Sequence, residues 1–214
     1  MNEFAQFPLI PLLTLESPQE AEFVGEILHD LSIFTLEIAL RTPHALKCLS
    51  VLCKTYPQMQ IGAGTVRTTT QAKAAYDVGA TFFMSPGFSP NLGEFMLKNN
   101  LKWFPGVDCT FALEVALAQG WSTLKLFPAQ ALGGPLYIKA LEAPYPEVKW
   151  IATGGIDRNN LTSYLSLPSV TALGLTALVP RDLIQQRNSK ALFHHIQSYI
   201  DLIQSPTRNK ENLL

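Results

Sequence analysis

The chain has 214 residues, of which 47% are hydrophobic and 15% are charged, and its 16 basic and 17 acidic side chains give a formal net charge of -1. Nucleic acids and anionic membranes attract clustered Lys and Arg, so this near-neutral balance predicts neither as a partner. The charged fraction is below the roughly 25% of typical soluble domains. It indicates either a large buried core or surfaces that are covered in an oligomer.

The cysteines and the N-terminus bear on the compartment. Cys48, Cys53 and Cys109 are an odd number of thiols without a CxxC spacing, which argues against a disulfide framework and against a structural zinc site. The sequence begins Met-Asn-Glu without a basic n-region, and Pro8 and Pro11 interrupt its first apolar run. We therefore expect a cytoplasmic protein that is not exported.

Short apolar runs alternate with longer amphipathic segments along the chain, which predicts alternating strands and helices. The expected strands are Leu9–Leu13, Ile33–Leu40, Gln60–Thr65, Thr81–Met84, Lys102–Phe104, Thr123–Phe127, Lys149–Thr153 and Val170–Leu173. The first four helices are expected to begin at Ser17-Pro18, Thr42-Pro43, Thr68 and Ser89-Pro90. The later helices are expected over Thr110–Gln119, Pro135–Leu141, Asp157–Leu165 and Arg181–Ile203.

Eight strand–helix units of about 25 residues each predict an α/β protein, a single-domain (β/α)8 TIM barrel over residues 1–205, followed by a polar C-terminal tail over residues 206–214. A doubly wound parallel sheet has the same alternation, but no G-x-G-x-x-G fingerprint follows the first strand. The uncharged stretch 159–180 is long enough to span a membrane. It contains Pro168 and Gly174, and therefore predicts a helix, a loop and a strand inside the core.

The alternation of side chains along two expected strands places charged groups inside the barrel. Glu37 and Arg41 share the face of the second strand opposite its apolar residues, and Lys125 and Phe127 share the inner face of the sixth. A lysine in an apolar strand is costly to bury unless it is paired or functional. One reading is a structural ion pair, of Glu37 with Lys125 or of Glu37 with Arg41, and the other is that Lys125 is an amine nucleophile; the pattern leaves both open.

Two glycine-containing segments follow the last two expected strands. They are Thr153-Gly154-Gly155-Ile156 and Gly174-Leu175-Thr176. Barrels often bind phosphate at this place through backbone N–H groups and a helix N-terminus. Ordinary loop glycines are the alternative reading. Together with an inward lysine, however, the two segments predict a phosphorylated carbonyl substrate.

Six short segments occur in one order at near-regular spacing. They are Leu36-Glu37-Ile38-Ala39-Leu40-Arg41-Thr42, Gly62-Ala63-Gly64-Thr65-Val66, Ser85-Pro86-Gly87, Phe104-Pro105-Gly106-Val107, Lys125-Leu126-Phe127-Pro128-Ala129 and Thr153-Gly154-Gly155-Ile156. This series resembles the 2-keto-3-deoxy-6-phosphogluconate (KDPG) and 4-hydroxy-2-oxoglutarate (KHG) aldolases, which are class I enzymes of the (β/α)8 type. The resemblance extends from Pro8 to about Ile203.

The resemblance implies a role for each site residue. Lys125 would form a Schiff base with the 2-keto carbon, and Glu37 would shuttle protons. The substrate-binding residues implied are Arg41 and Thr65 at the pyruvoyl end, Pro86 and Phe127 as pocket walls, Thr153 near the hydroxylated carbons, and Gly154, Gly155, Gly174, Leu175 and Thr176 at the phosphate. The resemblance also implies no cofactor and no metal, a small-molecule 2-keto acid as substrate, and a homotrimer.

The implied activity is that of a lyase of the Entner–Doudoroff pathway, which would cleave KDPG to pyruvate and glyceraldehyde 3-phosphate, and also KHG to pyruvate and glyoxylate. Two alternatives remain. Tyr137–Leu141 has some likeness to the aldolase for the galactonate-derived epimer, and a barrel could also bind a phosphorylated metabolite without turning it over.

The chain departs from the family pattern in three places. Leu175 and Thr176 stand where Gly and Ser are usual, and Gln130 replaces a common acidic residue. Only seven residues precede Pro8, so the N-terminal helix that often closes the bottom of the barrel is expected to be short or absent.

Overall fold

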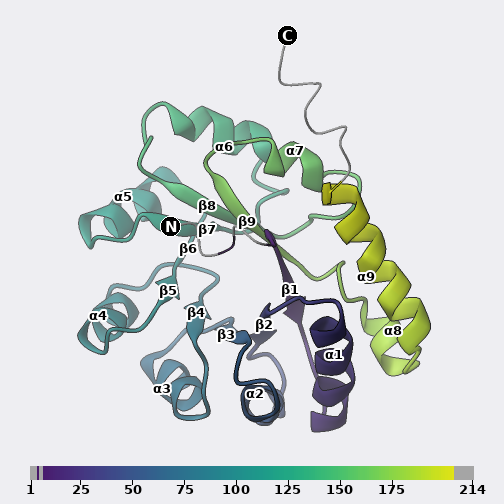
Figure 1. The fold of residues 1–214 in the computed structure, drawn as a ribbon. Coiled ribbons are helices and arrows are strands. Elements are labelled where there is room, and N and C mark those ends of the chain that lie inside the picture. The colour runs from purple at the N-terminus through teal and green to yellow at the C-terminus, as the bar shows by residue number, and fades with distance from the viewer. Residues whose placement is uncertain (1–3, 5–6, 205–214) are drawn as a thin grey trace.

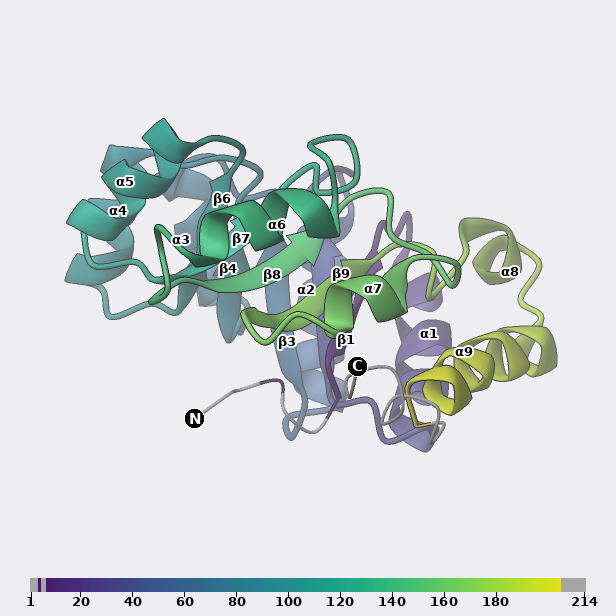
Figure 2. The same cartoon turned by 90° about the horizontal axis from the view of Figure 1, so that it is seen from above.

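A computed structural model describes residue 4 and residues 7–204 of the chain. In this part of the chain nine parallel strands form one sheet in the order β5-β4-β3-β2-β1-β9-β8-β7-β6, and the helices surround it (Figure 1). The view turned by 90° shows the helices α6 and α7 on one side of the strands and α1, α8 and α9 together at one end (Figure 2). This is the predicted barrel of parallel strands with helices between them.

The strands are β1 (Leu9–Leu13), β2 (Thr35–Ala39), β3 (Gln60–Gly64), β4 (Phe82–Met84), β5 (Trp103–Phe104), β6 (Gly106–Val107), β7 (Thr123–Leu126), β8 (Lys149–Thr153) and β9 (Val170–Leu175). The helices are α1 (Pro18–Asp30), α2 (Ala45–Thr55), α3 (Thr69–Asp77), α4 (Pro90–Lys98), α5 (Thr110–Ala118), α6 (Pro135–Glu142), α7 (Leu161–Leu165), α8 (Arg181–Gln185) and α9 (Ser189–Gln204). Of the two domain segments predicted from the sequence, the tail at 206–214 lies outside the described residues.

The fifth barrel position consists of two short strands, where the sequence predicted one. Pro105 separates β5 from β6, and a proline has no N–H to donate to a strand ladder. Its carbonyl still accepts a hydrogen bond from the backbone N–H of Lys125, at 2.8 Å. The sheet therefore continues from β4 through this broken strand to β7 and nearly closes the barrel.

The alternation predicted for the strands is present in the packing. Leu36, Ile38, Leu124 and Leu126 belong to the main hydrophobic core, whereas a separate apolar cluster draws on the intervening positions of the strands. That interior cluster consists of Phe4, Ile10, Phe82, Met84, Phe104, Ile151 and Ala172. The ring centroid of Phe4 lies 5.7 Å from that of Phe104, so a side chain that precedes β1 helps to fill the barrel.

The starts of α1, α3 and α4 agree with the sequence prediction, and the start of α2 is shifted. Ser17 and Thr68 cap α1 and α3 through their hydroxyl oxygens, and Pro90 opens α4. The second helix begins at Ala45 because the hydroxyl of Thr42 is engaged elsewhere, donating a hydrogen bond to the carbonyl of Leu15 at 2.6 Å. That bond joins the segments that follow β1 and β2.

The last predicted helix, Arg181–Ile203, is two helices. Arg187 has a positive φ of 49°, which ends α8, and the side chain of Asn188 accepts a hydrogen bond from the N–H of Ala191 at the start of α9. The seventh helix is shorter than predicted, because it begins at Leu161 and not at Asp157.

The uncharged stretch 159–180 contains α7 and β9, as the turn signals predicted. Among the helices of the described residues, none has the length and apolar character needed to cross a membrane.

Candidate active site

Lys125 on β7 and Glu37 on β2 meet inside the barrel. Their side chains are 4% and 1% exposed, and the Nζ of Lys125 donates a hydrogen bond to the Oε1 of Glu37 at 3.3 Å. Three strands, β1, β9 and β8, separate β2 from β7 in the sheet, so the contact between the two side chains crosses the lumen of the barrel. The strand alternation therefore predicted the position of both charged groups correctly.

A glycine makes room for the Glu37 carboxylate. A Cβ atom placed on Gly64 would collide with the carboxylate of Glu37, so only a residue without a side chain fits there. The Oε2 atom of Glu37 is buried and has no hydrogen-bond partner among the described residues. Since buried polar atoms are nearly always paired, an unpaired oxygen beside a lysine points to a ligand or water site.

Thr153 presents a second unpaired oxygen to the same interior. It ends β8, is 4% exposed, and its Oγ1 lacks a hydrogen-bond partner in the described part of the chain. The neighbouring Gly174 of β9 lies so close that a Cβ there would press on the Thr153 side chain. The inward face near the strand ends thus combines an amine, a carboxylate and a hydroxyl.

Arg41 and Thr65 follow the neighbouring strands β2 and β3. The Nε of Arg41 donates a hydrogen bond to the Oγ1 of Thr65 at 3.0 Å, which leaves the terminal guanidinium N–H groups available to an anion. Thr65 was predicted as the last residue of a strand, but it follows the strand and has a φ of 59°. A left-handed β-branched residue is strained, and such residues concentrate at functional sites.

Pro86 and Phe127 both lie at the carboxyl ends of strands. The Phe127 ring centroid is 5.8 Å from the Nζ of Lys125, so this ring does adjoin the amine. Pro86 is held by Ser85, a buried residue to which the sequence analysis gave no role. The Ser85 hydroxyl donates to the carbonyl of Gly87 at 2.7 Å and accepts from the indole N–H of Trp103 at 3.1 Å.

The loop after β8 has the backbone conformation that an anion site requires. Gly154 and Gly155 have φ values of 103° and 74°, a region that favours glycine. The N–H of Gln130 donates to the carbonyl of Gly154 at 3.0 Å, and the side-chain amide of Asn160 donates to the carbonyl of Gly155 at 2.9 Å. Two neighbouring segments therefore hold this loop.

The end of β9 differs from its prediction. Leu175 was predicted in a phosphate loop, but it is the last residue of β9, and its fully buried side chain belongs to the main core outside the barrel. It does not crowd the mouth of the barrel, because it points away from the lumen. Thr176, the next residue, is exposed, and Gly174 faces the lumen beside Thr153.

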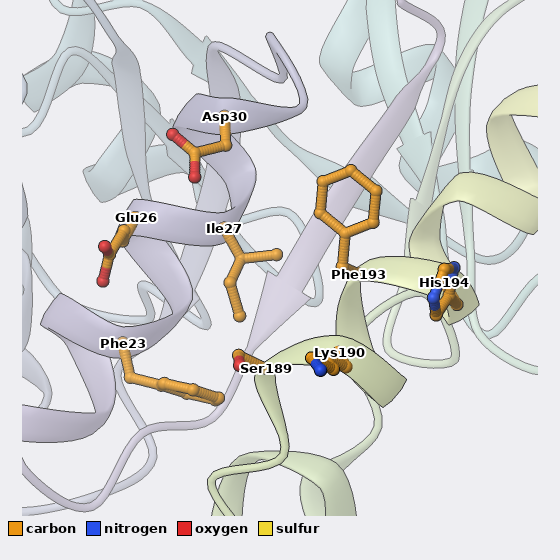
Figure 3. Close-up of a pocket in the computed structure, with 8 residues that line it drawn as sticks. All are labelled: Phe23, Glu26, Ile27, Asp30, Ser189, Lys190, Phe193 and His194. Atoms are coloured by element: carbon orange, nitrogen blue, oxygen red, sulfur yellow. The ribbon is translucent and has the colours of Figure 1, made fainter.

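A pocket with a volume of about 460 Å3 lies elsewhere, between α1 and α9 (Figure 3). Its lining residues are Phe23, Glu26, Ile27, Asp30, Ser189, Lys190, Phe193 and His194. Most of these side chains are exposed, and none belongs to a strand of the barrel. A reacting group there would not be sheltered from water, so this pocket is a poor candidate for an imine-forming site.

Among the described residues there is no group of three or more His, Cys, Asp or Glu side chains placed to hold a metal ion. Cys48, Cys53 and Cys109 are free thiols. Burial raises the pKa of the Cys48 and Cys53 thiols to about 11, so neither is a ready nucleophile at neutral pH.

A parallel α/β barrel with unpaired polar atoms and a charged pair near the carboxyl ends of its strands belongs to the class of barrel enzymes that carry out chemistry at that face. A comparison with family models identifies the family. The model described as "Aldolase: KDPG and KHG aldolase" matches residues 1–195. The chain belongs to this family of lyases.

Individual relatives agree with the family match. The chain is 37% identical over 172 residues to the 2-dehydro-3-deoxy-phosphogluconate aldolase of Treponema pallidum, covering 80% of this chain and 82% of the relative. It is 30% identical over 178 residues to the KHG/KDPG aldolase of Escherichia coli K12, covering 83% and 84%.

A solved structure is also similar. It is KDPG aldolase from Legionella pneumophila with pyruvate captured at low pH as a covalent carbinolamine intermediate, and it matches with a TM-score of 0.88 and 36% identity over 91% of this chain and 95% of that chain.

Proposed function

We propose that the chain cleaves KDPG to pyruvate and glyceraldehyde 3-phosphate, and KHG to pyruvate and glyoxylate, through an imine on Lys125. The observation that carries this proposal is the buried contact between Lys125 and Glu37, with one carboxylate oxygen unpaired beside the amine. A purely structural ion pair would leave no reason for that unpaired oxygen. A carbinolamine, as captured in the Legionella relative, requires an amine nitrogen of this kind.

The chemistry follows from the two side chains. Transfer of a proton from Lys125 to Glu37 leaves a neutral amine, which adds to the C2 carbonyl. The Glu37 carboxyl group then gives its proton to the carbinolamine hydroxyl, which leaves as water, and a protonated imine and the Glu37 carboxylate remain. Glu37 takes the proton from the C4 hydroxyl. The C3–C4 bond then breaks, its electron pair forms the C2–C3 double bond of an enamine, and the aldehyde leaves. The same carboxyl group returns the proton to C3, and water hydrolyses the imine to release pyruvate.

The substrate carboxylate would lie against Arg41. A guanidinium can bind a carboxylate through two parallel hydrogen bonds, and the bond to Thr65 fixes the plane of the group. Phe127 and Pro86 would form the walls beside C2, and the unpaired Thr153 hydroxyl would bind a hydroxyl of the substrate. No bound metal or organic cofactor enters any of these steps.

The phosphate would lie at the backbone N–H groups of Gly154 and Gly155. The positive φ angles of the two glycines support this assignment, and exposed Thr176 after β9 would add a hydroxyl. Gly174 would line the approach, whereas Leu175 would contribute only core packing. We expect the phosphorylated substrate to be preferred over KHG in kcat/KM.

Borohydride reduction in the presence of pyruvate tests the imine. We expect one reduced pyruvyl group in the intact mass, mapped to Lys125, and no label in Lys125→Ala. Lys139→Ala is the matched control, because Lys139 lies on an outer helix and should not affect labelling. A label on Lys139 or Lys149 would refute the assignment. The absence of any adduct would favour a barrel that only binds a phosphorylated metabolite.

The substrate can be separated from its epimer by direct assay. The proposed function predicts a higher kcat/KM for KDPG than for the galactonate-derived epimer at equal concentrations. The reverse order would establish the epimer aldolase as the correct alternative.

We further propose a homotrimer in the cytoplasm. Two large apolar side chains at the starts of α5 and α6, Phe111 and Leu136, are 77% and 78% exposed, which a partner subunit would cover. The free cysteines suit a reducing compartment. Light scattering on the purified chain tests the assembly, and a monomeric mass at micromolar concentration would contradict it.

A further inference from the structure

One face of α9 contacts both loops to which the proposed function assigns the substrate phosphate. The first loop follows β8 and contains Gly154 and Gly155, and the second follows β9 and begins at Thr176. Because β8 and β9 are parallel neighbours in the sheet, the two loops leave it at the same edge. His195 and Tyr199 lie one turn apart on α9, and each contacts one of these loops.

His195 holds the loop after β9. Its Nε2 lies 2.8 Å from the carbonyl oxygen of Ala177, the residue that follows Thr176. Because a carbonyl oxygen can only accept a hydrogen bond, Nε2 carries a proton and donates it to this bond. The carbonyl of Thr176 accepts from the N–H of Val179 at 3.4 Å, so Ala177 lies within a four-residue turn. The imidazole therefore ties this turn to α9.

Tyr199 contacts the loop after β8. Its side chain is buried, and the guanidinium carbon of Arg158 lies 5.7 Å from the centroid of its ring, within the range of a cation–π contact. Burial, and to a smaller extent the charge of Asp157, raise the pKa of the Tyr199 hydroxyl, which stays protonated at neutral pH. The ring centroids of His195 and Tyr199 are 5.3 Å apart. Two adjoining rings on one helix thus connect the two loops.

Such a connection matters for a site made of loop groups. An anion is bound well only when its donors already stand in the right positions, because ordering a mobile loop on binding costs conformational entropy. Thr176 is exposed and follows the last residue of β9, so the sheet itself does not fix its hydroxyl. The hydrogen bond from α9 to the next residue supplies a fixed point for this turn.

We infer that His195 is a positioning residue for recognition of the substrate phosphate. Its Nε2–H holds the turn after β9 in the conformation in which Thr176 contributes its hydroxyl to the phosphate. His195 acts through the turn and does not touch the substrate. This inference rests on the proposed function, which assigns the phosphate to the Gly154–Gly155 loop and to Thr176.

The decisive variant is His195→Leu, which retains an apolar side chain on α9 and removes the donor to Ala177. We expect kcat/KM for KDPG to fall by a factor of about 3 to 10, mainly through KM, which is the size expected for one neutral hydrogen bond. For 2-keto-3-deoxygluconate, the same substrate without its phosphate, kcat/KM should change less than about twofold. His195→Phe, which keeps a ring against Tyr199, repeats the test if the leucine variant does not fold.

Two further variants separate the hydrogen bond from the packing of the helix. His195→Gln loses the ring but keeps a side-chain N–H donor of similar reach, so it should recover most of the preference for KDPG. His194→Leu is the matched control, because this neighbouring imidazole is exposed and lines the pocket between α1 and α9 (Figure 3). It should leave the preference between the two substrates unchanged.

Inorganic phosphate provides a readout that does not depend on turnover. Its dissociation constant, measured by calorimetry, should rise by the same factor in His195→Leu and stay constant in His194→Leu.

The outcomes for His195 and for the proposed function can be told apart. If wild type forms the pyruvate adduct but His195→Leu keeps both the KDPG preference and the phosphate affinity, the role of His195 is overturned and the aldolase remains. Equal losses for both substrates, or no recovery in His195→Gln, would also overturn it, because they indicate a purely structural role. If wild type forms no adduct, the proposed function fails, and phosphate affinity alone decides the role of His195.

Discussion

The two parts of the barrel interior belong to one sheet, but apolar side chains fill one part and polar side chains line the other. One part is the interior cluster around Phe4, Phe82 and Phe104, where apolar side chains fill the space against one another. The other part holds Lys125, Glu37 and Thr153, with two buried oxygen atoms unpaired among the described residues. The packed part contributes to stability. The part with unpaired polar atoms leaves hydrogen-bonding positions for a ligand.

The largest expected effect comes from the polar part. Glu37→Gln keeps the volume of the side chain and a hydrogen-bond acceptor for Lys125, but it cannot accept and return a proton. We expect kcat for KDPG cleavage to fall by a factor on the order of 10² to 10⁴. Stopped-flow assays together with borohydride labelling measure this, and labelling with pyruvate should persist.

Two outcomes would contradict that assignment. If Glu37→Gln kept the kcat of wild type, Glu37 would not be the group that transfers the proton. Loss of wild-type activity in EDTA, restored by a divalent metal, would indicate a different class of mechanism.

The apolar part should respond in stability and not in chemistry. Phe82→Ala removes a ring that is 1% exposed and faces Phe4 and Phe104. We expect the free energy of unfolding to fall by about 3–5 kcal/mol, as for other buried Phe→Ala changes, with kcat largely retained in the folded fraction. Urea denaturation measures the change, and Leu97→Ala, at a side chain 54% exposed, is the control. A folded Phe82→Ala protein without activity would show that the two parts are not independent.

The smallest expected effect is on the pH dependence of stability, through Tyr164. Its hydroxyl donates a hydrogen bond to the Oε1 of Gln130, whose N–H in turn donates to the carbonyl of Gly154 in the proposed phosphate loop. Because burial raises the pKa of Tyr164 from 10.0 to about 12, the folded state holds this proton more tightly than the unfolded state. The resulting stability is present below about pH 10 and is lost as the pH rises through the folded pKa. Wild type should therefore lose more stability than Tyr164→Phe between about pH 10 and pH 12. Equal losses would show that Tyr164 does not titrate in the folded chain as its burial implies.

The sequence predicted the barrel because short apolar strands alternate with amphipathic helices along the chain. It placed Lys125 and Glu37 inside the barrel because the side chains of any strand alternate with a period of two residues. It misplaced Leu175 because the predicted strand stopped two residues early. Continuing the alternation from Leu173 would have placed Leu175 outside and Gly174 inside, as the structure does. The break at Pro105 could also have been predicted, since proline cannot donate to a ladder.

The support of the phosphate loop could not be predicted in this way. Gln130 meets Asn160 and Tyr164 across 30 and 34 positions of sequence. Such a meeting depends on how two turns are folded over the strand ends, and neither composition nor periodicity contains that information. The role of Ser85 under Pro86 is similar, because its partner Trp103 lies on the next strand.

Gly64 has a consequence for attempts to re-engineer this enzyme. Randomising the pocket by choosing side chains that face the substrate would pass over a residue that has none. Yet the methyl group of Gly64→Ala would occupy the space of the Glu37 carboxylate. A substitution that adds a single carbon atom would therefore displace one of the reacting groups. Tolerance to substitution in this pocket is therefore set by the residues that make space as much as by those that make contact.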